Sequence, residues 1–293
     1  MMSKEPDLTD LSVLRGILAR HGLRPNKALG QHFLIDRAAL ASLVEAAELS
    51  LEENVLEVGA GTGVLTIELA RRVQRVIAVE LDRQMLPLLK ESTSPFPQVE
   101  ILPRDLLQVD PGELFGGQTY KLVANLPYYI TALTLRHFLE CTHPPSSLIV
   151  MVQKEVAERM AAEPGDMSLL ALSVQFYGAP RIIASVPAEA FFPSPKVDSA
   201  IIRVDLFQEP PLSGMARDDF FHLTHAGFAE KRKQLHNSLA HNLHVSQATV
   251  GDWLTTAGID PMRRAETLSL DEWLRLTLIV RSEDQPQPGA AQV

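Results

Sequence analysis

Residues 54–63, Asn54-Val-Leu-Glu-Val-Gly-Ala-Gly-Thr-Gly63, predict a buried strand that ends in a glycine-rich turn and feeds a helix. Glycines let a backbone turn tightly and approach a ligand closely, because no Cβ stands in the way. A dinucleotide fingerprint needs G-x-G-x-x-G, whereas this turn has G-x-G-x-G with Val64 in place of the third glycine. With the acidic Glu57 inside the strand, the turn favours a ligand with a cationic head, such as S-adenosylmethionine. The expected backbone contacts are Gly59, Gly61 and Gly63.

Outward from this turn, short β-branched runs alternate with amphipathic stretches between about residues 53 and 205, which predicts an α/β domain with a mostly parallel sheet. The predicted strands are Asn54–Val58, Arg75–Val79, Val99–Leu102, Lys121–Ala124, Ser147–Val152, Arg181–Ser185 and Ala200–Leu206. The intervening helices are expected to begin near Thr62, Asp82, Thr131, Gln153 and Ser168, after two leading helices at Leu8–His21 and Asp36–Leu49.

A change of composition after Phe207 predicts a domain boundary, since Gln208-Glu-Pro-Pro-Leu-Ser-Gly214 is followed by no β-like run. We therefore expect a Rossmann-like catalytic domain over residues 1–207 and a smaller all-helical domain over residues 208–293. The helices expected in the second domain are Arg217–Gly227, Lys231–Asn242, Ser246–Ala257 and Ser269–Arg281, followed by a tail that need not fold.

Composition indicates a globular protein, with 46% hydrophobic and 22% charged residues among 293. No apolar run approaches the roughly 18 residues that span a bilayer, and the polar start lacks a signal-peptide pattern. We therefore expect a cytoplasmic protein without a membrane partner. The single cysteine, Cys141, excludes an internal disulfide and is expected to be a buried structural thiol. Five histidines between His222 and His244 lack cysteine or carboxylate companions in a metal pattern, so no metal is expected.

The net charge of −9 argues against nonspecific coating of nucleic acid, because phosphate binding is supplied by Lys and Arg. Two local basic clusters could still contact phosphate, or could simply be solvated helix faces. They comprise Arg15, Arg20, Arg24 and Lys27 near the start, and Lys231, Arg232 and Lys233 in the second domain.

Two carboxylates follow predicted strands at positions suited to a nucleoside cofactor. Glu80 ends the strand after the glycine turn, about 20 residues beyond the first glycine, where an acid accepts hydrogen bonds from ribose hydroxyls. Asp105 follows the third strand and could accept a hydrogen bond from the adenine amine of the cofactor.

The tetrapeptide Asn125-Leu126-Pro127-Tyr128 follows the fourth strand and predicts methyl transfer to an adenine amine. Adenine N6 is a poor nucleophile because its lone pair is conjugated with the ring, so acceptors that hold its hydrogens assist transfer. The Asn125 side-chain oxygen and the Leu126 carbonyl can be those acceptors, and Pro127 restricts the backbone. Tyr128 offers a face on which an extruded base can stack.

Taken together, these motifs resemble the ribosomal RNA adenine N6-dimethyltransferase family, specifically its small-subunit (16S) branch. The likeness spans nearly the whole chain and includes Leu29–Asp36, Val152–Val156, Phe191–Ser199, Glu230–Gln234, Asn237–Leu239 and Arg264–Ser269. It implies cofactor contacts from His32, Leu34, Gly59, Glu80, Asp105 and Asn125, and a second aromatic contact to the target base from Phe191. The family usually has Asn at the positions of His32 and Tyr129, so these two residues depart from its pattern.

The implied reaction is four methyl transfers from S-adenosylmethionine to two adjacent adenosines near the 3′ end of 16S rRNA, on an assembling small subunit. S-adenosylhomocysteine would be the product, and the protein would be a monomer.

Several alternatives stay open at this point. The antibiotic-resistance branch, which dimethylates one large-subunit rRNA adenine, is disfavoured by Leu126 and the Arg264–Ser269 segment. Leu126 also disfavours a DNA adenine methyltransferase, whose tetrapeptide usually has two prolines, and the missing third glycine disfavours an NAD-dependent oxidoreductase. A mainly non-catalytic ribosome-assembly factor would be separated from an enzyme by replacing Asn125.

Overall fold

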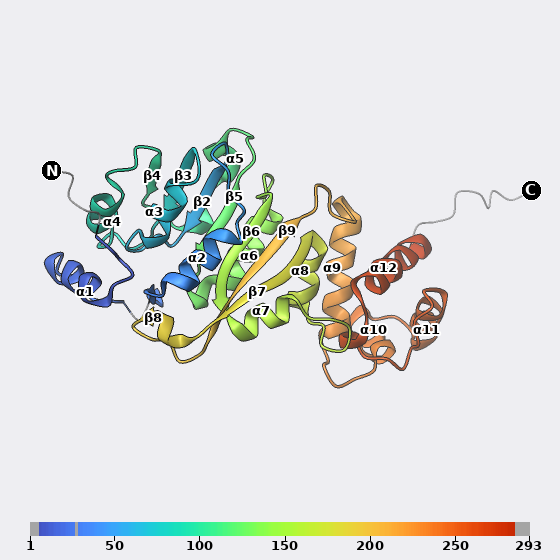
Figure 1. The fold of residues 1–293 in the computed structure, drawn as a ribbon. Coiled ribbons are helices and arrows are strands. Elements are labelled where there is room, and N and C mark those ends of the chain that lie inside the picture. Colours follow the sequence, from blue (N-terminus) through green and yellow to red (C-terminus); the bar gives the residue numbers. More distant parts are fainter. Residues whose placement is uncertain (1–5, 27–28, 285–293) are drawn as a thin grey trace, which may run out of the picture. The chain divides into compact units, whose positions relative to one another are not determined.

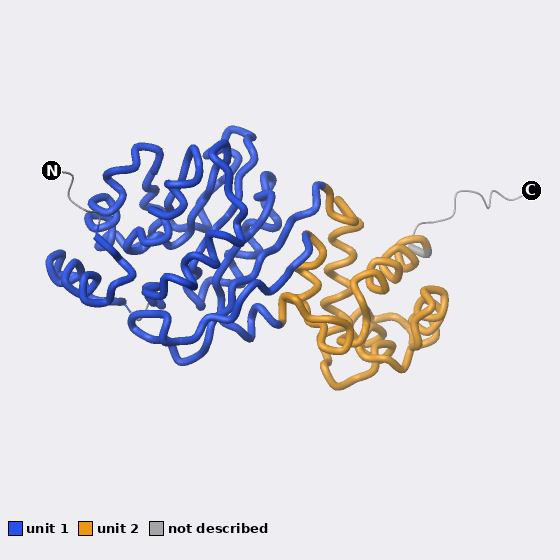
Figure 2. Tube along the Cα trace, viewed as in Figure 1, with its two compact units in different colours: residues 1–158, 178–208 blue, residues 159–177, 209–293 orange. Residues whose placement is uncertain are grey.

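A computed structural model describes residues 6–26 and 29–284 (Figure 1). Lys27 of the predicted basic stretch and the predicted tail at 285–293 lie outside the described residues. The chain forms two compact units (Figure 2). Unit 1 comprises Met1–Glu158 and Gly178–Gln208, and unit 2 comprises Arg159–Tyr177 and Glu209–Val293.

The sheet of unit 1 has seven strands in the order β4-β3-β2-β5-β6-β9-β7. The strands are β2 (Asn54–Val58), β3 (Arg75–Val79), β4 (Val99–Leu102), β5 (Lys121–Asn125), β6 (Ser147–Gln153), β7 (Gly178–Val186) and β9 (Ser199–Leu206). The first five run parallel, and β9 runs antiparallel to both β6 and β7. All seven predicted strands and the mostly parallel sheet are confirmed.

Helices cover both faces of this sheet. The helices up to Met160 are α1 (Leu11–Arg20), which packs on α3 and α4, α2 (Arg37–Glu45), α3 (Val64–Ala70), α4 (Leu86–Thr93), α5 (Pro111–Phe115), α6 (Thr131–Glu140) and α7 (Lys154–Met160), of which the short α5 was not predicted. The β2-α3-β3 and β5-α6-β6 connections step in opposite directions along the sheet. Since such crossovers are right-handed, α3 and α6 lie on opposite faces. Cys141 follows α6 and is only half-buried, not fully buried as predicted.

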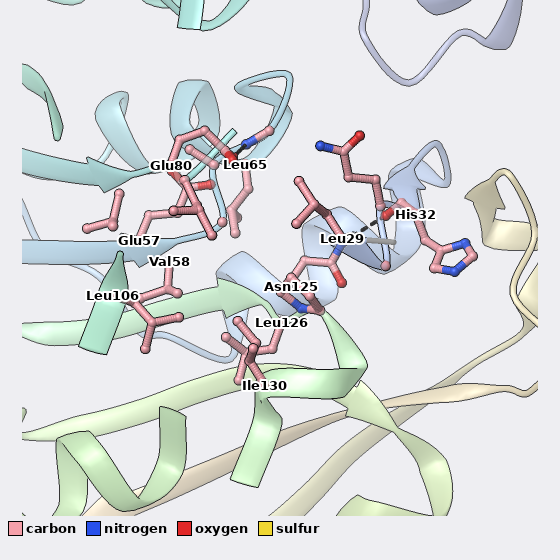
Figure 3. A pocket seen from close by; sticks show the side chains of 18 of the residues that line it. Leu29, His32, Glu57, Val58, Leu65, Glu80, Leu106, Asn125, Leu126 and Ile130 are labelled. Atoms are coloured by element: carbon pink, nitrogen blue, oxygen red, sulfur yellow. Dashed lines mark hydrogen bonds between the residues drawn. The ribbon is translucent and has the colours of Figure 1, made fainter. Parts of the chain in front are cut away.

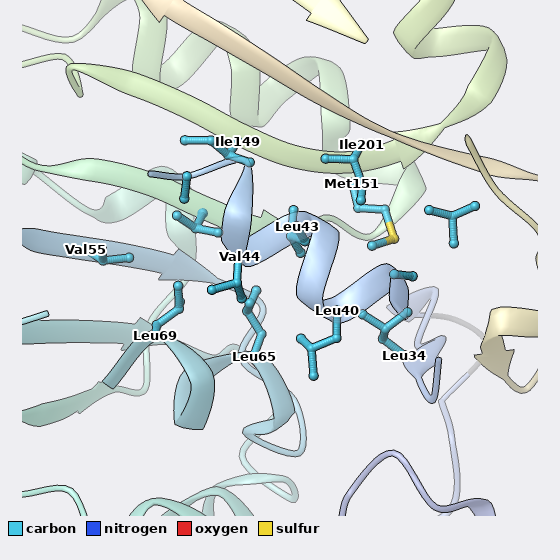
Figure 4. Close-up of a cluster of buried hydrophobic side chains, with 14 of the residues drawn as sticks. Leu34, Leu40, Leu43, Val44, Val55, Leu65, Leu69, Ile149, Met151 and Ile201 are labelled. Carbon is cyan, nitrogen blue, oxygen red and sulfur yellow. The ribbon is translucent and has the colours of Figure 1, made fainter. Parts of the chain in front are cut away.

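The main core of unit 1 lies between the sheet and two helices (Figure 4). Leu43 and Val44 of α2 and Leu65 and Leu69 of α3 pack against strand residues that alternate toward the same face. Those strand residues are Val55, Val76, Val123, Ile149, Met151 and Ile201. β2 and β5 are buried on both faces of the sheet. Their packing fixes the points from which the loops after Val58 and Asn125 begin.

Unit 2 is all-helical, with α8 (Leu169–Tyr177), α9 (Gly214–Phe228), α10 (Leu235–Leu243), α11 (Gln247–Thr256) and α12 (Leu270–Asp284). The domain prediction needs correction here, since residues 159–177 were expected in the catalytic domain. Phe176 of α8 is fully buried and packs with Phe220 of α9, at 4.7 Å between ring centroids. The apolar face of α8 therefore completes the core of unit 2.

The predicted start of α10 also needs correction. This helix begins at Leu235, four residues later than the predicted Lys231, because the Leu235 N–H donates to the Arg263 carbonyl (2.7 Å). Lys231, Arg232 and Lys233 are therefore exposed in the preceding loop.

Over residues 6–26 and 29–284 no helix has the length and apolarity to cross a membrane. In the same ranges, no three His, Cys, Asp or Glu side chains gather as a metal site.

Candidate active site

A cavity lies where β2, β3, β4 and β5 present their carboxyl ends, which is the usual ligand position in an open α/β sheet (Figure 3). Its wall combines the segment 29–34 with the loops that follow these four strands. Most of the predicted site residues line it, namely His32, Leu34, Gly59, Gly61, Glu80, Asp105, Asn125, Leu126, Pro127 and Tyr128. Figure 3 shows Asn125 between the Glu57–Glu80 side of the cavity and His32. Gly63 and Phe191 are absent from this wall.

The turn after β2 depends on glycine at two positions in the cavity wall. Gly59 (φ +76°) and Gly61 (φ +55°) have left-handed backbone conformations that other residues rarely adopt. A Cβ at Gly59 would lie 3.5 Å from Cδ of Pro127, so the glycine turn and the tetrapeptide are in contact. The Gly61 N–H donates to the Glu80 carboxylate (2.7 Å). These contacts bring the glycine turn, the Glu80 carboxylate and the Asn125–Tyr128 tetrapeptide together around one cavity.

Gly63 has a different role from the one expected. It precedes α3 with φ +86°, and a Cβ there would lie 2.5 Å from Oγ of Ser92 and 3.1 Å from Cδ1 of Leu89. The Ser92 hydroxyl donates to the Thr62 carbonyl (2.9 Å), which holds α4 against the turn. The third glycine therefore permits the close approach of α3 and α4, and the cofactor-contact expectation is corrected on this geometry.

Gly63→Ala is expected to destabilise the full chain by about 2–3 kcal/mol, because the added methyl group overpacks a buried contact and strains a left-handed residue. Urea unfolding would measure the loss. Gly16→Ala is the matched control, since a Cβ at Gly16 within α1 meets open space and should leave stability unchanged or raise it by up to about 1 kcal/mol. Equal midpoints for Gly63→Ala and the wild type would contradict this role.

Glu80 and Asp105 supply acceptors at the ends of β3 and β4. The Glu80 side chain is 7% exposed, and its second oxygen accepts from the Asp82 N–H (2.8 Å). Burial raises the pKa of Glu80, although these backbone donors oppose the shift. Asp105 is half-buried, and its Oδ1 accepts from the Leu107 N–H (3.0 Å). Each backbone donor fixes a carboxylate while lone pairs remain for a ligand.

Glu57 is a member of the cavity wall whose position the sequence indicated only as an acidic environment. It is 1% exposed, and its Oε2 has no hydrogen-bond partner among the described residues. Burial, followed by the nearby Glu80 carboxylate, raises the pKa of Glu57 to about 8. A buried carboxyl with an unpartnered oxygen suits a cationic ligand, because the ligand charge would offset the cost of ionisation.

The Asn125 amide is oriented by the segment opposite it. Its Nδ2 donates to the His32 carbonyl (3.2 Å), which leaves Oδ1 as the acceptor of this side chain. The Leu126 N–H donates to the Met151 carbonyl (3.1 Å) on β6, so the peptide after Asn125 stays tied to the sheet. Two oxygens, Oδ1 of Asn125 and the Leu126 carbonyl, are thus carried on a fixed backbone at the cavity.

Tyr128 is half-buried beside this loop. Its hydroxyl lies 2.7 Å from Oγ of Ser199, and burial raises its pKa, so the phenol stays neutral. The His32 ring stacks near the Tyr128 ring at 5.9 Å between centroids and 24° between planes. The Nδ1 of His32 lies 2.6 Å from the Pro193 carbonyl, which orients this imidazole. His32 therefore connects the 29–34 segment, the tetrapeptide and the loop after residue 192.

Phe191 does not reach the cavity, and the expected contact with a target base is corrected accordingly. It is 3% exposed and packs in the main core of unit 1. It belongs to β8 (Phe191–Phe192), which pairs antiparallel with β1 (Phe33–Leu34) and places Phe191 opposite Leu34. This two-stranded ladder was not predicted, because two residues carry no usable periodicity. Its effect is to fix the cavity segment beside the core.

The cavity residues fit S-adenosylmethionine. The glycine turn leaves its wall free of side chains, Glu57 offers a buried carboxyl to a cation, and Glu80 and Asp105 offer acceptors to a nucleoside. Gln31 and Tyr129 also line the cavity. Gln31 was not among the predicted site residues, and Tyr129 was expected only to depart from the family pattern. The fold and this site define a Rossmann-like, S-adenosylmethionine-dependent methyltransferase.

Comparison with known proteins defines the family. The ribosomal RNA adenine dimethylase family matches residues 22–282, and the chain belongs to this family. It is 50% identical over 258 residues to ribosomal RNA small subunit methyltransferase A of Dehalococcoides mccartyi (strain ATCC BAA-2266), covering 88% of this chain and 89% of the relative. It is 40% identical to the protein of the same name from Shouchella clausii, covering 94% of this chain and 96% of that one.

Solved structures agree with this assignment. A dimethyladenosine transferase from Plasmodium falciparum superposes with a TM-score of 0.73 at 25% identity, covering 86% of this chain and 98% of that one. The 23S rRNA methyltransferase ErmE superposes with a TM-score of 0.71 at 29% identity, covering 85% of this chain and 99% of that one. The chain is an rRNA adenine dimethyltransferase that uses S-adenosylmethionine.

Proposed function

We propose that this enzyme dimethylates N6 of two adjacent adenosines near the 3′ end of 16S rRNA, in four methyl transfers that accompany assembly of the small subunit. The observation that carries the choice of subunit is the identity of 40–50% to relatives named for the small subunit, against 29% to the 23S enzyme. We further propose that the enzyme acts in the cytoplasm as a monomer.

The proposed cofactor site uses the acids at the strand ends. Glu80 would accept the ribose hydroxyls, Asp105 would accept from the adenine amine, and the backbone at Gly59 and Gly61 would approach the ligand without a side chain between them. Leu34 and His32 would complete this wall. When bound, S-adenosylmethionine supplies an electrophilic methyl group on a sulfonium, whose positive charge suits the wall that carries Glu57.

The proposed catalytic groups are Asn125 and Leu126. The Asn125 side-chain oxygen and the Leu126 carbonyl would accept hydrogen bonds from the two N–H groups of the adenine amine in the first transfer, and from its one remaining N–H in the second, which favours a pyramidal nitrogen with an available lone pair. Pro127 restricts the backbone that carries that carbonyl, and the Tyr128 ring would stack with the extruded base. No general base is needed before transfer, because the methylated amine becomes acidic and loses its proton to water.

The proposed role of unit 2 is rRNA recognition. Lys231, Arg232 and Lys233 are exposed in the loop before α10, and Lys233 also pairs with Glu230 (2.7 Å). A compact basic loop can bind phosphate even though the whole chain carries a net charge of −9, since contact depends on the local distribution of charge.

The test is methylation of isolated ribosomal subunits. The purified protein is incubated with tritiated S-adenosylmethionine and with small subunits that lack the modification, and the rRNA is digested to nucleosides. We expect N6,N6-dimethyladenosine in 16S rRNA, at up to two modified residues per subunit. Labelling of large-subunit rRNA or DNA instead would refute the proposed target while leaving the family assignment in place.

A further inference from the structure

Tyr129 lines the cavity but differs from Tyr128 in its surroundings. Tyr128 is half-buried with its hydroxyl on Ser199, whereas Tyr129 is 55% exposed. Both residues belong to η3 (Tyr128–Ile130), the short 3₁₀ turn between β5 and α6. An exposed aromatic ring at the edge of a cavity offers a flat, apolar face that a ligand can cover. The proposed function assigns no role to this ring.

Gly30 allows the Tyr129 ring to lie close to the opposite backbone. Gly30 has φ +58°, and a Cβ built on it would lie 3.4 Å from Cδ1 and 3.7 Å from Cε1 of Tyr129. The segment that carries Gly30 is held at two neighbouring residues. Gln31 donates to the Asp82 carboxylate (2.8 Å), and the His32 carbonyl accepts from Asn125. The Tyr129 ring therefore packs on backbone that is tied to the carboxyl ends of β3 and β5.

The surroundings of Tyr129 show which half of the cavity it borders. Its ring lines the same cavity wall as Asp105 and Glu80, and it packs on Gly30, whose neighbour Gln31 is bonded to Asp82 just beyond Glu80. In agreement with this position, burial, followed by the charges of Asp105 and then Glu80, raises the pKa of its phenol. These are the two acids that the proposed function assigns to the nucleoside of the cofactor. The ring that packs on Gly30 thus lies near the nucleoside half of the cavity.

We propose that Tyr129 is a cofactor-binding residue whose ring covers the adenosine of S-adenosylmethionine and shields it from solvent. This inference rests on the proposed cofactor site, because Glu80 and Asp105 define where the nucleoside lies. The contribution comes from the face of the ring, since the Tyr129 hydroxyl forms no hydrogen bond with the described residues. Binding then covers an aromatic surface that is otherwise exposed.

The test is isothermal titration of the full chain with S-adenosylhomocysteine, without RNA. We expect Tyr129→Ala to raise the Kd about ten-fold, a loss of the size that base–aromatic stacking produces, and Tyr129→Phe to stay within about two-fold of the wild type. The matched control is Leu133→Ala, because Leu133 is 52% exposed on α6 and does not line this cavity. Leu133→Ala should bind S-adenosylhomocysteine with the same Kd as the wild type.

A second ligand locates the contact. 5′-Methylthioadenosine retains the nucleoside half of the cofactor, so Tyr129→Ala should weaken its binding by the same factor. Equal affinity of Tyr129→Ala and the wild type for S-adenosylhomocysteine would overturn the inference, as would a loss seen only in the KM for rRNA, which would place an RNA nucleotide on the ring. Failure of the wild type itself to bind S-adenosylhomocysteine would instead refute the cofactor site on which the inference rests.

Discussion

Asn125→Ala is expected to lower kcat for adenine methylation by at least about 10²–10³-fold, the range found when one preorganised polar group is removed from a reacting centre. The variant removes the oxygen that we propose accepts a hydrogen bond from the adenine amine, and it also removes the Nδ2 donor to the His32 carbonyl. The tritium assay on small subunits measures the rate, and single-turnover conditions separate chemistry from product release.

Asn125→Asp is the matched variant, because it keeps a side-chain oxygen but loses the donor that faces the His32 carbonyl. We expect it to be impaired as well, since an acceptor would then face an acceptor. Titration with S-adenosylhomocysteine establishes whether each variant still binds cofactor. A rate for Asn125→Ala within about three-fold of the wild type would exclude Asn125 as a catalytic group and leave the cofactor site unaffected.

Glu57 is expected to make the stability of the cofactor-free protein fall as the pH rises from about 5 to about 9. Below its ordinary pKa of 4.5, both the folded and the unfolded chain hold the proton. Above 4.5 the unfolded chain releases it, while the folded chain retains it until about 8. Ionisation therefore lowers the free energy of the unfolded state relative to the folded state across this window, and the loss of stability levels off above it. At about 1.36 kcal/mol per pKa unit, the loss is at most roughly 5 kcal/mol.

Glu57→Gln should remove this dependence, because the amide has nearly the same shape and does not titrate. Urea unfolding at pH 5 and pH 9 measures the difference, and the wild type should lose several kcal/mol more than the variant. The exposed Glu52→Gln serves as control and should behave like the wild type. Parallel pH profiles for the wild type and Glu57→Gln would show that the buried carboxyl is ionised without penalty in the folded chain.

The sequence by itself determined the sheet and the order of its motifs. Residues 54–58 and 121–124 are apolar runs that end in residues suited to chemistry, and the alternation of strands and helices leaves few possible topologies. Carboxyl ends of parallel strands share one edge, so Gly59, Glu80 and Asn125 could be placed together before the fold was known. Local pattern carries such information because each element is stabilised by its own periodic burial.

Only the tertiary structure decided the roles of particular glycine, aromatic and acidic residues within this sheet and its loops. Gly63 contacts Ser92 instead of lining the cavity, and Phe191 is buried opposite Leu34 through a two-residue ladder that has no sequence period. Residues 159–177 belong to unit 2 because the apolar face of α8 packs against helices that come more than thirty residues later. The burial of Glu57 and the contact of Tyr129 with Gly30 were likewise decided by the tertiary structure. Gly30 and Tyr129 are distant in sequence and face the same cavity from different loops. Such contacts depend on the packing of side chains across elements, which periodicity along one element does not encode.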